Sequence, residues 1–394
     1  MSAAAERAPS APADRAPYSL RDLLAYFVRL GSLGFGGPVA LVGYMQRDLV
    51  DERRWISEKD FKEGLALAQL APGPLAAQLA IYLGWIDYGV LGATLVAFAF
   101  VLPSFLMVLG LSSFYLAYGG LPWMRGAFYG IGAAVIAMIA RGAYKLARST
   151  VGRDPLYMVL FAISAGVTAW TESEIVWVFL VCGAIAYALR ARHVASALPA
   201  AVLPLGWLVS GQSGPATPET LLKIGAYFAE AGAFVFGSGL AIVPFLHGGV
   251  VNDFHWLSEQ QFLDAVAVAM ITPGPVVITV AFIGYLVAGP IGAVAAALGV
   301  FLPCYLLVVI PARYFRRAVH DVRVKVFVDG VTVAAAGTIA GAAFVLGRRA
   351  IVDLPTLAIA ALTLLLVTRL RARYEPLVIV AAGIAGSALS GGAF

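Results

Sequence analysis

The chain has 394 residues, of which 61% are hydrophobic and only 12% are charged. A soluble globular domain carries roughly 45–50% apolar and about 25% charged residues, so this chain lacks the polar residues of a water-exposed surface. The composition excludes a soluble single-core enzyme, a disordered chain and a nucleic-acid-binding protein. Cys182 and Cys304 lie alone in apolar runs, so we expect neither a disulfide framework nor a metal site. The sequence predicts an all-α polytopic membrane protein embedded in the lipid bilayer.

Residues 1–19 are rich in Ala, Pro, Arg and Ser and lack a signal-peptide core, so they are predicted to form a disordered tail. About 13 apolar helical segments follow, seven before and six after a linker at 211–219. The first seven lie near 22–46, 61–87, 90–117, 123–147, 155–170, 174–190 and 196–210. The other six lie near 221–247, 262–287, 290–312, 326–347, 351–369 and 375–392.

The two sets of segments are copies of one motif. A shift of about 200 residues aligns Phe35-Gly36 with Phe236-Gly237, and Pro72-Gly73-Pro74 with Pro273-Gly274-Pro275. About a third of the residues from 26 to 80 are identical in this alignment. We therefore predict two repeats, residues 20–210 and residues 220–394.

Segment number and loop charge predict that the repeats have inverted topology. An odd number of segments precedes the second copy, so it should begin on the opposite side of the membrane. The loop 47–62 is rich in Arg and Lys, whereas its counterpart 248–263 contains neither. Since basic loops stay in the cytoplasm, these two loops should face opposite sides. Arg348 and Arg349 form the one basic cluster on the unexpected side.

The charge rule also suggests that the first two segments of each copy are broken or re-entrant. The N-terminal tail and loop 47–62 can both be cytoplasmic only if segment 22–46 enters and leaves on one face. Each of these segments is then a hairpin of two half-helices. The alternative, in which they span the membrane fully, stays open.

Bends rich in glycine and proline interrupt these segments at matching places. The first copy has Gly34-Phe35-Gly36-Gly37-Pro38 and Ala71-Pro72-Gly73-Pro74. The second has Val235-Phe236-Gly237-Ser238-Gly239 and Thr272-Pro273-Gly274-Pro275. Proline removes a backbone donor and glycine permits positive φ, so each bend should break its helix. Paired interrupted segments in a duplicated transporter indicate a binding site near the bilayer midplane.

The half-helices that follow the bends should begin with backbone N–H groups that lack helical partners. These include the groups of Val39, of Leu75 to Ala77 and of Val276 to Ile278. Each helix N-terminus is equivalent to roughly +0.5 charge, so four converging ends would supply about +2. Such a site suits a small dianion.

Polar side chains near the bends are further candidates for substrate binding. Arg29 could attract the anion and its repeat partner Glu230 could carry a proton, or the two could form an ion pair. Both could equally reach the membrane interface. Gln69, Gln78 and Thr272 could donate hydrogen bonds to the anion or link helices.

Other matched residues are given structural roles. Glu63 and Asp264 are interpreted as acids that stabilise helix N-termini. Gly126-x-x-x-Gly130 and Gly337-x-x-x-Gly341 are typical of helix packing, either within the chain or in a homodimer.

Three motifs of the first copy resemble a known family, the chromate transporters: Leu33-Gly34-Phe35-Gly36-Gly37-Pro38, Trp55-Ile56-Ser57 and Leu67-Ala68-Gln69-Leu70-Ala71-Pro72-Gly73-Pro74. The resemblance covers nearly the whole chain after residue 20. It implies export of chromate, a tetrahedral dianion, across the inner cell membrane, with chromate resistance as the result. The second copy departs from the pattern, with Ser238-Gly239 in place of Gly37-Pro38 and Met270 in place of Gln69.

Several alternatives remain open. The cargo could be sulfate or another oxyanion, and a channel, a scaffold or an intramembrane enzyme are rival functions. The chain has no phosphate-binding loop of the G-x-x-x-x-G-K-[ST] type. We therefore expect a secondary transporter without catalytic residues, cofactor or metal.

Overall fold

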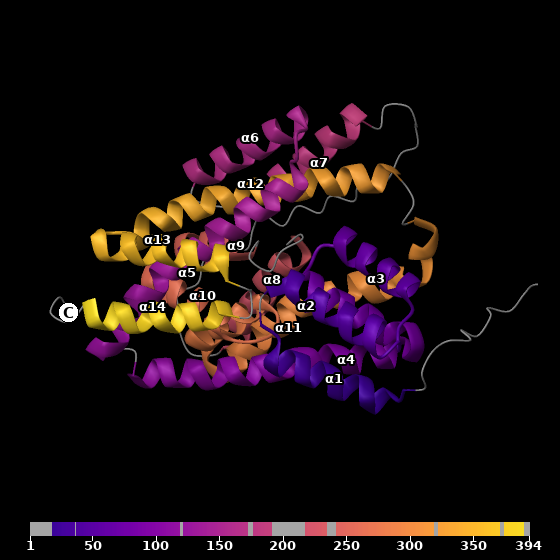
Figure 1. Ribbon diagram of the computed structural model, residues 1–394, viewed down its shortest axis with the longest axis horizontal. Coiled ribbons are helices and arrows are strands. Elements are labelled where there is room, and N and C mark those ends of the chain that lie inside the picture. Colours follow the sequence, from indigo (N-terminus) through magenta and orange to yellow (C-terminus); the bar gives the residue numbers. More distant parts are fainter. Residues whose placement is uncertain are drawn as a thin grey trace, which may run out of the picture.

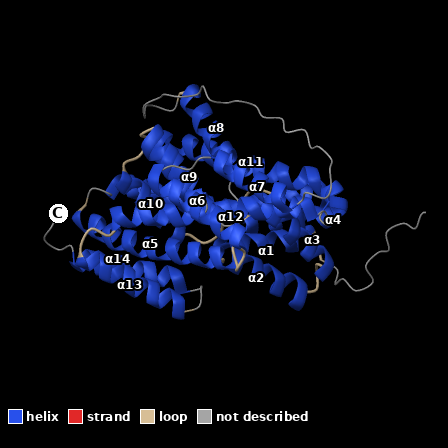
Figure 2. Ribbon diagram, turned by 90° about the horizontal axis from the view of Figure 1, so that it is seen from above, coloured by secondary structure: helices blue, strands red, loops and turns tan. Residues whose placement is uncertain are grey.

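The computed structural model describes residues 18–35, 37–118, 121–171, 176–190, 217–234, 242–318, 322–370 and 374–389. Within these ranges every regular element is a helix, as Figure 2 shows. The predicted all-α class is confirmed. The predicted segment 196–210 and residues 1–17 of the predicted tail lie outside the described residues.

The two copies contain corresponding elements in the same order. The first consists of α1 (Leu20–Leu33), α2 (Gly37–Met45), a π-helical segment (Gln46–Glu52), α3 (Glu58–Leu70), α4 (Leu75–Tyr118), α5 (Pro122–Thr150), α6 (Pro155–Thr171) and α7 (Val176–Arg190). The second consists of α8 (Pro218–Phe234), α9 (Ile242–His247), a π-helical segment (Gly248–Asp253), α10 (Glu259–Ile271), a 3₁₀ turn (Val276–Ile278), α11 (Thr279–Ala318), α12 (Val322–Ala350), α13 (Leu354–Arg369) and α14 (Glu375–Leu389).

The predicted breaks are present wherever the structure describes them. α1 ends at Leu33, and α2 begins at Gly37, whose φ is 72°. The second bend of each copy likewise separates α3 from α4 and α10 from the 3₁₀ turn. The first bend of the second copy, residues 235–239, lies outside the described residues.

The predicted boundary between the segments 61–87 and 90–117 is present. α4 is interrupted at Gly89, whose φ of 59° and ψ of −149° are not helical. α11 is interrupted in the same way at Gly289, where φ is 65°. A single positive-φ glycine can change the helix direction without a loop. The described ranges contain 14 α-helical elements, of which α4 and α11 each consist of two helices joined at such a glycine.

Side-chain caps fix several helix starts. Ser258 and Gln261 cap α10 reciprocally, while Ser57 accepts a hydrogen bond from the Asp60 N–H at the start of α3. Ser19 caps α1, and its hydrogen bonds hold the pKa of Asp22 below its ordinary value. Capping oxygens satisfy amides that have no helical partner, so these residues define where the half-helices begin.

Four helices are long and apolar enough to cross a bilayer: Leu75–Tyr118, Trp123–Arg148, Val276–Ala312 and Val326–Ala350. The shortest has 25 residues, which at 1.5 Å per residue exceeds a hydrocarbon core of about 30 Å. These four are two matching pairs, one pair from each copy. The structure therefore agrees with a multi-pass membrane protein.

The matching elements α4 and α11 lie against each other. Thr94, just after the break of α4, hydrogen-bonds to Tyr305 at 2.6 Å, and Ser113 near the end of α4 hydrogen-bonds to Tyr285, just before the break of α11, at 2.8 Å. The later residue of α4 therefore contacts the earlier residue of α11. These two contacts are in antiparallel order.

The outer helices exchange partners between the copies. α5 of the first copy packs with α13 and α14 of the second, and α12 of the second packs with α6 and α7 of the first (Figure 1). Glycines allow the close approach: a Cβ on Gly130 would lie 2.0 Å from the Ala382 carbonyl oxygen, and one on Gly337 would lie 2.4 Å from that of Phe161. Both G-x-x-x-G motifs therefore pack helices within the chain.

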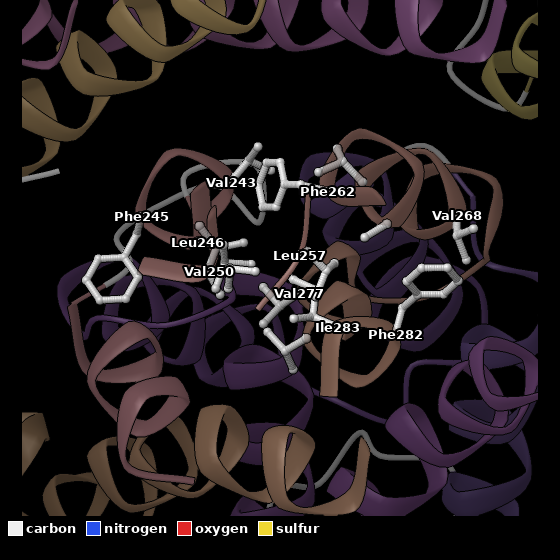
Figure 3. Close-up of a cluster of buried hydrophobic side chains, with 14 of the residues drawn as sticks. Val243, Phe245, Leu246, Val250, Leu257, Phe262, Val268, Val277, Phe282 and Ile283 are labelled. Atoms are coloured by element: carbon white, nitrogen blue, oxygen red, sulfur yellow. The ribbon is translucent and has the colours of Figure 1, made fainter. Parts of the chain in front are cut away.

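The largest buried apolar cluster belongs mainly to the second copy. Most of its side chains come from α8 to α11 and the others from α4, α5 and α12, and Figure 3 shows Val243, Leu246, Phe262 and Phe282 among them. A corresponding cluster holds α1 to α4 of the first copy together. Each copy therefore has its own apolar centre beside the bends.

Candidate functional site

The first and second bends of opposite copies meet in the structure. The Gly274 N–H donates a hydrogen bond to the Gly34 carbonyl oxygen at 2.9 Å. Ser104 of α4 donates a hydrogen bond to the Gly31 carbonyl oxygen at 3.1 Å. A Cβ on residue 274 would lie only 2.0 Å from the Ser104 hydroxyl oxygen. Since Gly274 also has a φ of 98°, only glycine fits this contact.

The equivalent contact recurs with the copies exchanged. A Cβ on Gly73, whose φ is 137°, would lie 3.0 Å from the Cys304 Sγ of α11. The Cys304 thiol donates to the carbonyl oxygens of Gly232, at 3.4 Å, and Val300, at 3.0 Å. Ser104 and Cys304 occupy matching positions in the two copies, as do Gly31 and Gly232. The second bend of each copy therefore lies between the first helix and the long helix of the other copy.

The other residues of the first bends are only partly described. Gly34 is buried, and Phe35, Gly37 and Pro38 are half-buried. Gly36, Phe236, Gly237, Ser238 and Gly239 lie outside the described residues, as does the side chain of Val39. Within the second bends, Pro74, Pro273 and Pro275 are buried and Pro72 is half-buried.

Gln78 is the one predicted polar candidate with an unused buried atom. Its Nε2 donates to the Pro72 carbonyl oxygen at 2.5 Å, while its buried Oε1 has no partner among the described residues. The Thr272 hydroxyl donates to the Val268 carbonyl oxygen of its own helix at 2.7 Å. Gln69 is exposed. Gln78 therefore braces the Pro72 bend, whereas Gln69 lies at the surface.

The predicted free amides are present in part. In the described chain, the N–H groups of Leu75, Ala76 and Ala77 have no hydrogen-bond partner, nor do those of Val276 and Val277. The prediction is wrong for Ile278, whose N–H donates to the Pro275 carbonyl oxygen at 3.0 Å. The β-branched run 276–278 begins with a tight 3₁₀ turn, which uses this donor one residue earlier than an α-helix would.

These free amides are covered in the described conformation. Leu75 and Val276 are only 8% and 9% exposed, and Ala76, Ala77 and Val277 are exposed still less. A helix N-terminus with unpartnered donors carries positive partial charge, so each of these two sites favours an anion.

The two predicted charged candidates are not brought together. Arg29 on α1 and Glu230 on α8 are both exposed, and they form no ion pair with one another in the described part of the chain. No group of His, Cys, Asp and Glu that could hold a metal ion occurs among the described residues.

Sequence reasoning missed a buried acid beside the site. Asp264 was interpreted as a helix N-terminal acid, but it lies more than one turn inside α10 and is only 4% exposed. Tyr115 of α4 donates a hydrogen bond to it at 2.7 Å. The alignment with Glu63 gave a matched pair of acids, but the contact with a tyrosine of the other copy could not be derived from it.

Comparisons with known proteins agree with the resemblance. The family model described as chromate transporter matches residues 21–187 and again residues 222–387. A chromate transport protein of Cupriavidus metallidurans is 56% identical over 375 residues, covering 94% of this chain and 93% of that protein. A probable chromate transport protein of Synechococcus elongatus is 55% identical, covering 94% of this chain and 95% of that protein.

A chromate transport protein of Pseudomonas aeruginosa is more distant, 35% identical over 82% of this chain and 80% of its own length. No solved structure matches the chain. The family model covers both copies, and the relatives from Cupriavidus metallidurans and Synechococcus elongatus align over almost the full length. The chain belongs to the chromate transporter family.

Proposed function

We propose that this chain exports chromate across the cytoplasmic membrane as a secondary transporter, and that export confers chromate resistance. The names of the relatives support chromate as the cargo. One geometric observation supports a transport site at the bends: in two matching places, a glycine- and proline-rich bend of one copy lies against the long helix of the other.

We propose further that the two copies, residues 20–210 and 220–394, have opposite orientations in the membrane. The support is the antiparallel order of the contacts between α4 and α11, the matching elements that are both long enough to span. The charge rule agrees, and its one exception has a physical reason. Arg349 forms an ion pair with Glu259, which compensates its charge.

The anion would bind where the half-helices begin. The unpartnered amides of Leu75 to Ala77 and of Val276 and Val277 donate to oxyanion oxygens, and the two helix ends together supply about +1 charge. A doubly charged ion in apolar surroundings costs tens of kcal/mol unless such groups replace its hydration. Opening would break the contact between Gly34 and Gly274 and expose these amides to one side of the membrane at a time.

The membrane potential is sufficient to drive export. An inside-negative potential favours outward movement of a negative charge by about 2.3 kcal/mol per 100 mV, and of a dianion by about twice that. Metabolic energy would then enter through the potential rather than through a nucleotide.

The test is chromate flux into inside-out vesicles with and without an imposed potential. Wild-type vesicles should accumulate chromate faster with the potential than without it. Pro38→Ala and Pro74→Ala should lower this flux sharply, because each change lets a half-helix extend through its bend. Pro155→Ala is the matched control, since Pro155 is an exposed proline at the start of α6.

The outcomes separate the proposal from its alternatives. Unchanged flux in both Pro38→Ala and Pro74→Ala would refute the anion site at the bends. Sulfate has the same charge and tetrahedral shape, so competition between chromate and sulfate in these vesicles decides the cargo. Chromate flux at the wild-type rate in a variant that carries both Pro38→Ala and Pro74→Ala would favour a channel or a scaffold.

A further inference from the structure

A single carboxyl group lies deep in the apolar cluster of the second copy. Asp264 is 4% exposed, and its neighbours on α10, including Phe262, Leu263 and Val266, are buried as well. Phe262 and Phe282 of this cluster are visible in Figure 3. A charged carboxylate in such surroundings costs several kcal/mol unless its charge is compensated. Acids at membrane depth are rare and usually functional.

The partners of Asp264 are neutral. The Tyr115 hydroxyl donates to its Oδ2 at 2.7 Å, and the Gln260 side-chain amide donates to its Oδ1 at 2.9 Å. The Tyr115 ring lies between Phe128 and Phe282, with ring centroids 5.5 and 5.3 Å away. Two neutral donors stabilise the carboxylate form but bring no positive charge, so the neutral acid form is accessible as well.

The charged and titratable groups on the elements packed around α10 bond to residues other than Asp264 or are exposed. Glu259 of α10 is bound by His247 and Arg349, Glu375 of α14 is paired with Arg141 of α5, and the Tyr285 hydroxyl of α11 bonds to Ser113. The Tyr129 hydroxyl of α5 donates to Asp353. Arg125, Lys145 and Arg148 on α5 and Asp253 at the end of the π-helical segment are exposed. Asp264 forms no ion pair within the described residues.

Its counterpart in the first copy is placed differently. The Glu63 side chain is 24% exposed, and its carboxylate lies 4.0 Å from the Lys59 ammonium group. Its charge is therefore partly hydrated and partly compensated. Burial without a cation distinguishes Asp264 from this matched acid.

Asp264 also takes part in a contact between the two copies. Asp264 on α10 accepts a hydrogen bond from Tyr115 of α4. At the bend that follows α10, Gly274 lies against Ser104, which is also on α4. Both contacts attach the second hairpin to α4 of the first copy. Anything that weakens the contact of Asp264 with Tyr115 therefore loosens the helix that carries the bend.

We propose that Asp264 is the proton-binding site that couples oxyanion movement to proton movement, an inference that rests on the proposed transport function. A proton that binds Oδ1 or Oδ2 forms an O–H bond and leaves the side chain neutral. The neutral acid no longer needs both donors, so α10 can separate from Tyr115 and the Gly274 bend can move. Loss of the proton restores the carboxylate and draws the hairpin back to α4.

The experiment uses the full chain in liposomes of phosphatidylcholine and phosphatidylglycerol, with the potential clamped at zero by valinomycin and equal potassium. A chromate gradient is imposed at alkaline pH, where chromate is the dianion, and an enclosed pH dye reports proton movement. Wild-type protein should move protons together with chromate. Asp264→Asn should lower proton movement to the level of protein-free liposomes and make chromate exchange independent of pH, and Asp264→Glu should restore both.

A second variant, Tyr115→Phe, tests the proposal if Asp264→Asn does not fold. Tyr115→Phe removes one donor to the carboxylate, so the midpoint of the pH dependence of chromate flux should move to higher pH by about half a unit to one unit. Asp253→Asn, at an exposed acid of the π-helical segment that precedes α10, should behave as wild type.

The failures are distinguishable. Chromate flux without proton movement in the wild type would overturn the role of Asp264 and leave the proposed function intact. Proton movement that survives Asp264→Asn, or that is lost in Glu230→Gln and not in Asp264→Asn, would also overturn it. A wild-type protein without chromate flux would refute the proposed function and this inference with it.

Discussion

Gly274→Ala should lower the free energy of unfolding more than an alanine substitution at any uncrowded glycine. The new Cβ would lie 2.0 Å from the Ser104 hydroxyl and 3.3 Å from the Gly31 carbonyl oxygen, at a residue whose φ is 98°. Left-handed backbone costs a non-glycine residue about 1–2 kcal/mol, and an added methyl in a packed contact costs about 1–3 kcal/mol. The sum predicts a loss of about 2–5 kcal/mol in the free energy of unfolding.

Substitutions at two other glycines distinguish the cost of backbone strain from the cost of steric overlap by the new Cβ. Gly89 has a φ of 59° but no atom within 4 Å of a Cβ, so Gly89→Ala should cost only the backbone term. Gly110 is helical and equally open, so Gly110→Ala should be neutral or slightly stabilising. Ser104→Ala removes the colliding hydroxyl, so the double variant with Gly274→Ala should recover part of the loss.

The free energies are measured by unfolding in mixtures of SDS and mild detergent, and function by chromate flux in vesicles. Gly274→Ala should lose flux together with stability, because the substituted bend can no longer seat against α4. Equal stability and flux in Gly274→Ala and Gly110→Ala would refute the contact of the bends. A Gly274→Ala defect that Ser104→Ala leaves unrelieved would assign the loss to backbone strain alone.

Three other changes test the packing and the topology. Gly386→Leu should destabilise the chain and reduce expression by forcing α14 from α5, where a Cβ would already lie 2.4 Å from a backbone oxygen. Cysteines introduced by Glu52→Cys and Asp253→Cys should react with an impermeant maleimide from opposite faces of the membrane, and labelling from one face would contradict inverted copies. Cys304→Ser should keep chromate flux near wild type, because Ser104 already fills the matching place with a hydroxyl, whereas a large loss would show that the thiol itself is needed.

The helices and their breaks could be predicted because their causes are local. Proline and positive-φ glycine interrupt a helix wherever they stand, so Pro72 and Gly73 were sufficient to place the end of α3. The break at Gly89 could be predicted as well, since this positive-φ glycine lies between the predicted segments 61–87 and 90–117. The 3₁₀ turn at 276–278 was missed, because its first amides differ from those of an α-helix only by one donor.

The contacts between the copies could not be predicted, because they join residues far apart in the chain. Tyr115 and Asp264 are 149 positions apart, and neither the repeat alignment nor periodicity relates a tyrosine of one copy to an acid of the other. The charge rule gave a clue of another kind. Arg348 and Arg349 disagreed with the remaining clusters, and the structure pairs Arg349 with Glu259. A basic residue that violates the rule can therefore indicate a nearby acid.

The exchange of partners between the copies bears on how such a chain could open to one side at a time. Each second bend rests on the long helix of the other copy, Gly274 on Ser104 and Gly73 beside Cys304, so neither hairpin can move without leaving that helix. The contacts between α4 and α11 are in antiparallel order, so the same motion in the two copies would loosen opposite ends of this pair. If the copies are inverted as proposed, one loosened hairpin exposes the amides to the cytoplasm and the other exposes them to the outside. Asp264 is buried beside the hairpin of the second copy and forms no ion pair within the described residues, whereas its counterpart Glu63 lies 4.0 Å from the Lys59 ammonium group. A proton on Asp264 would therefore bias one of these two openings and not the other.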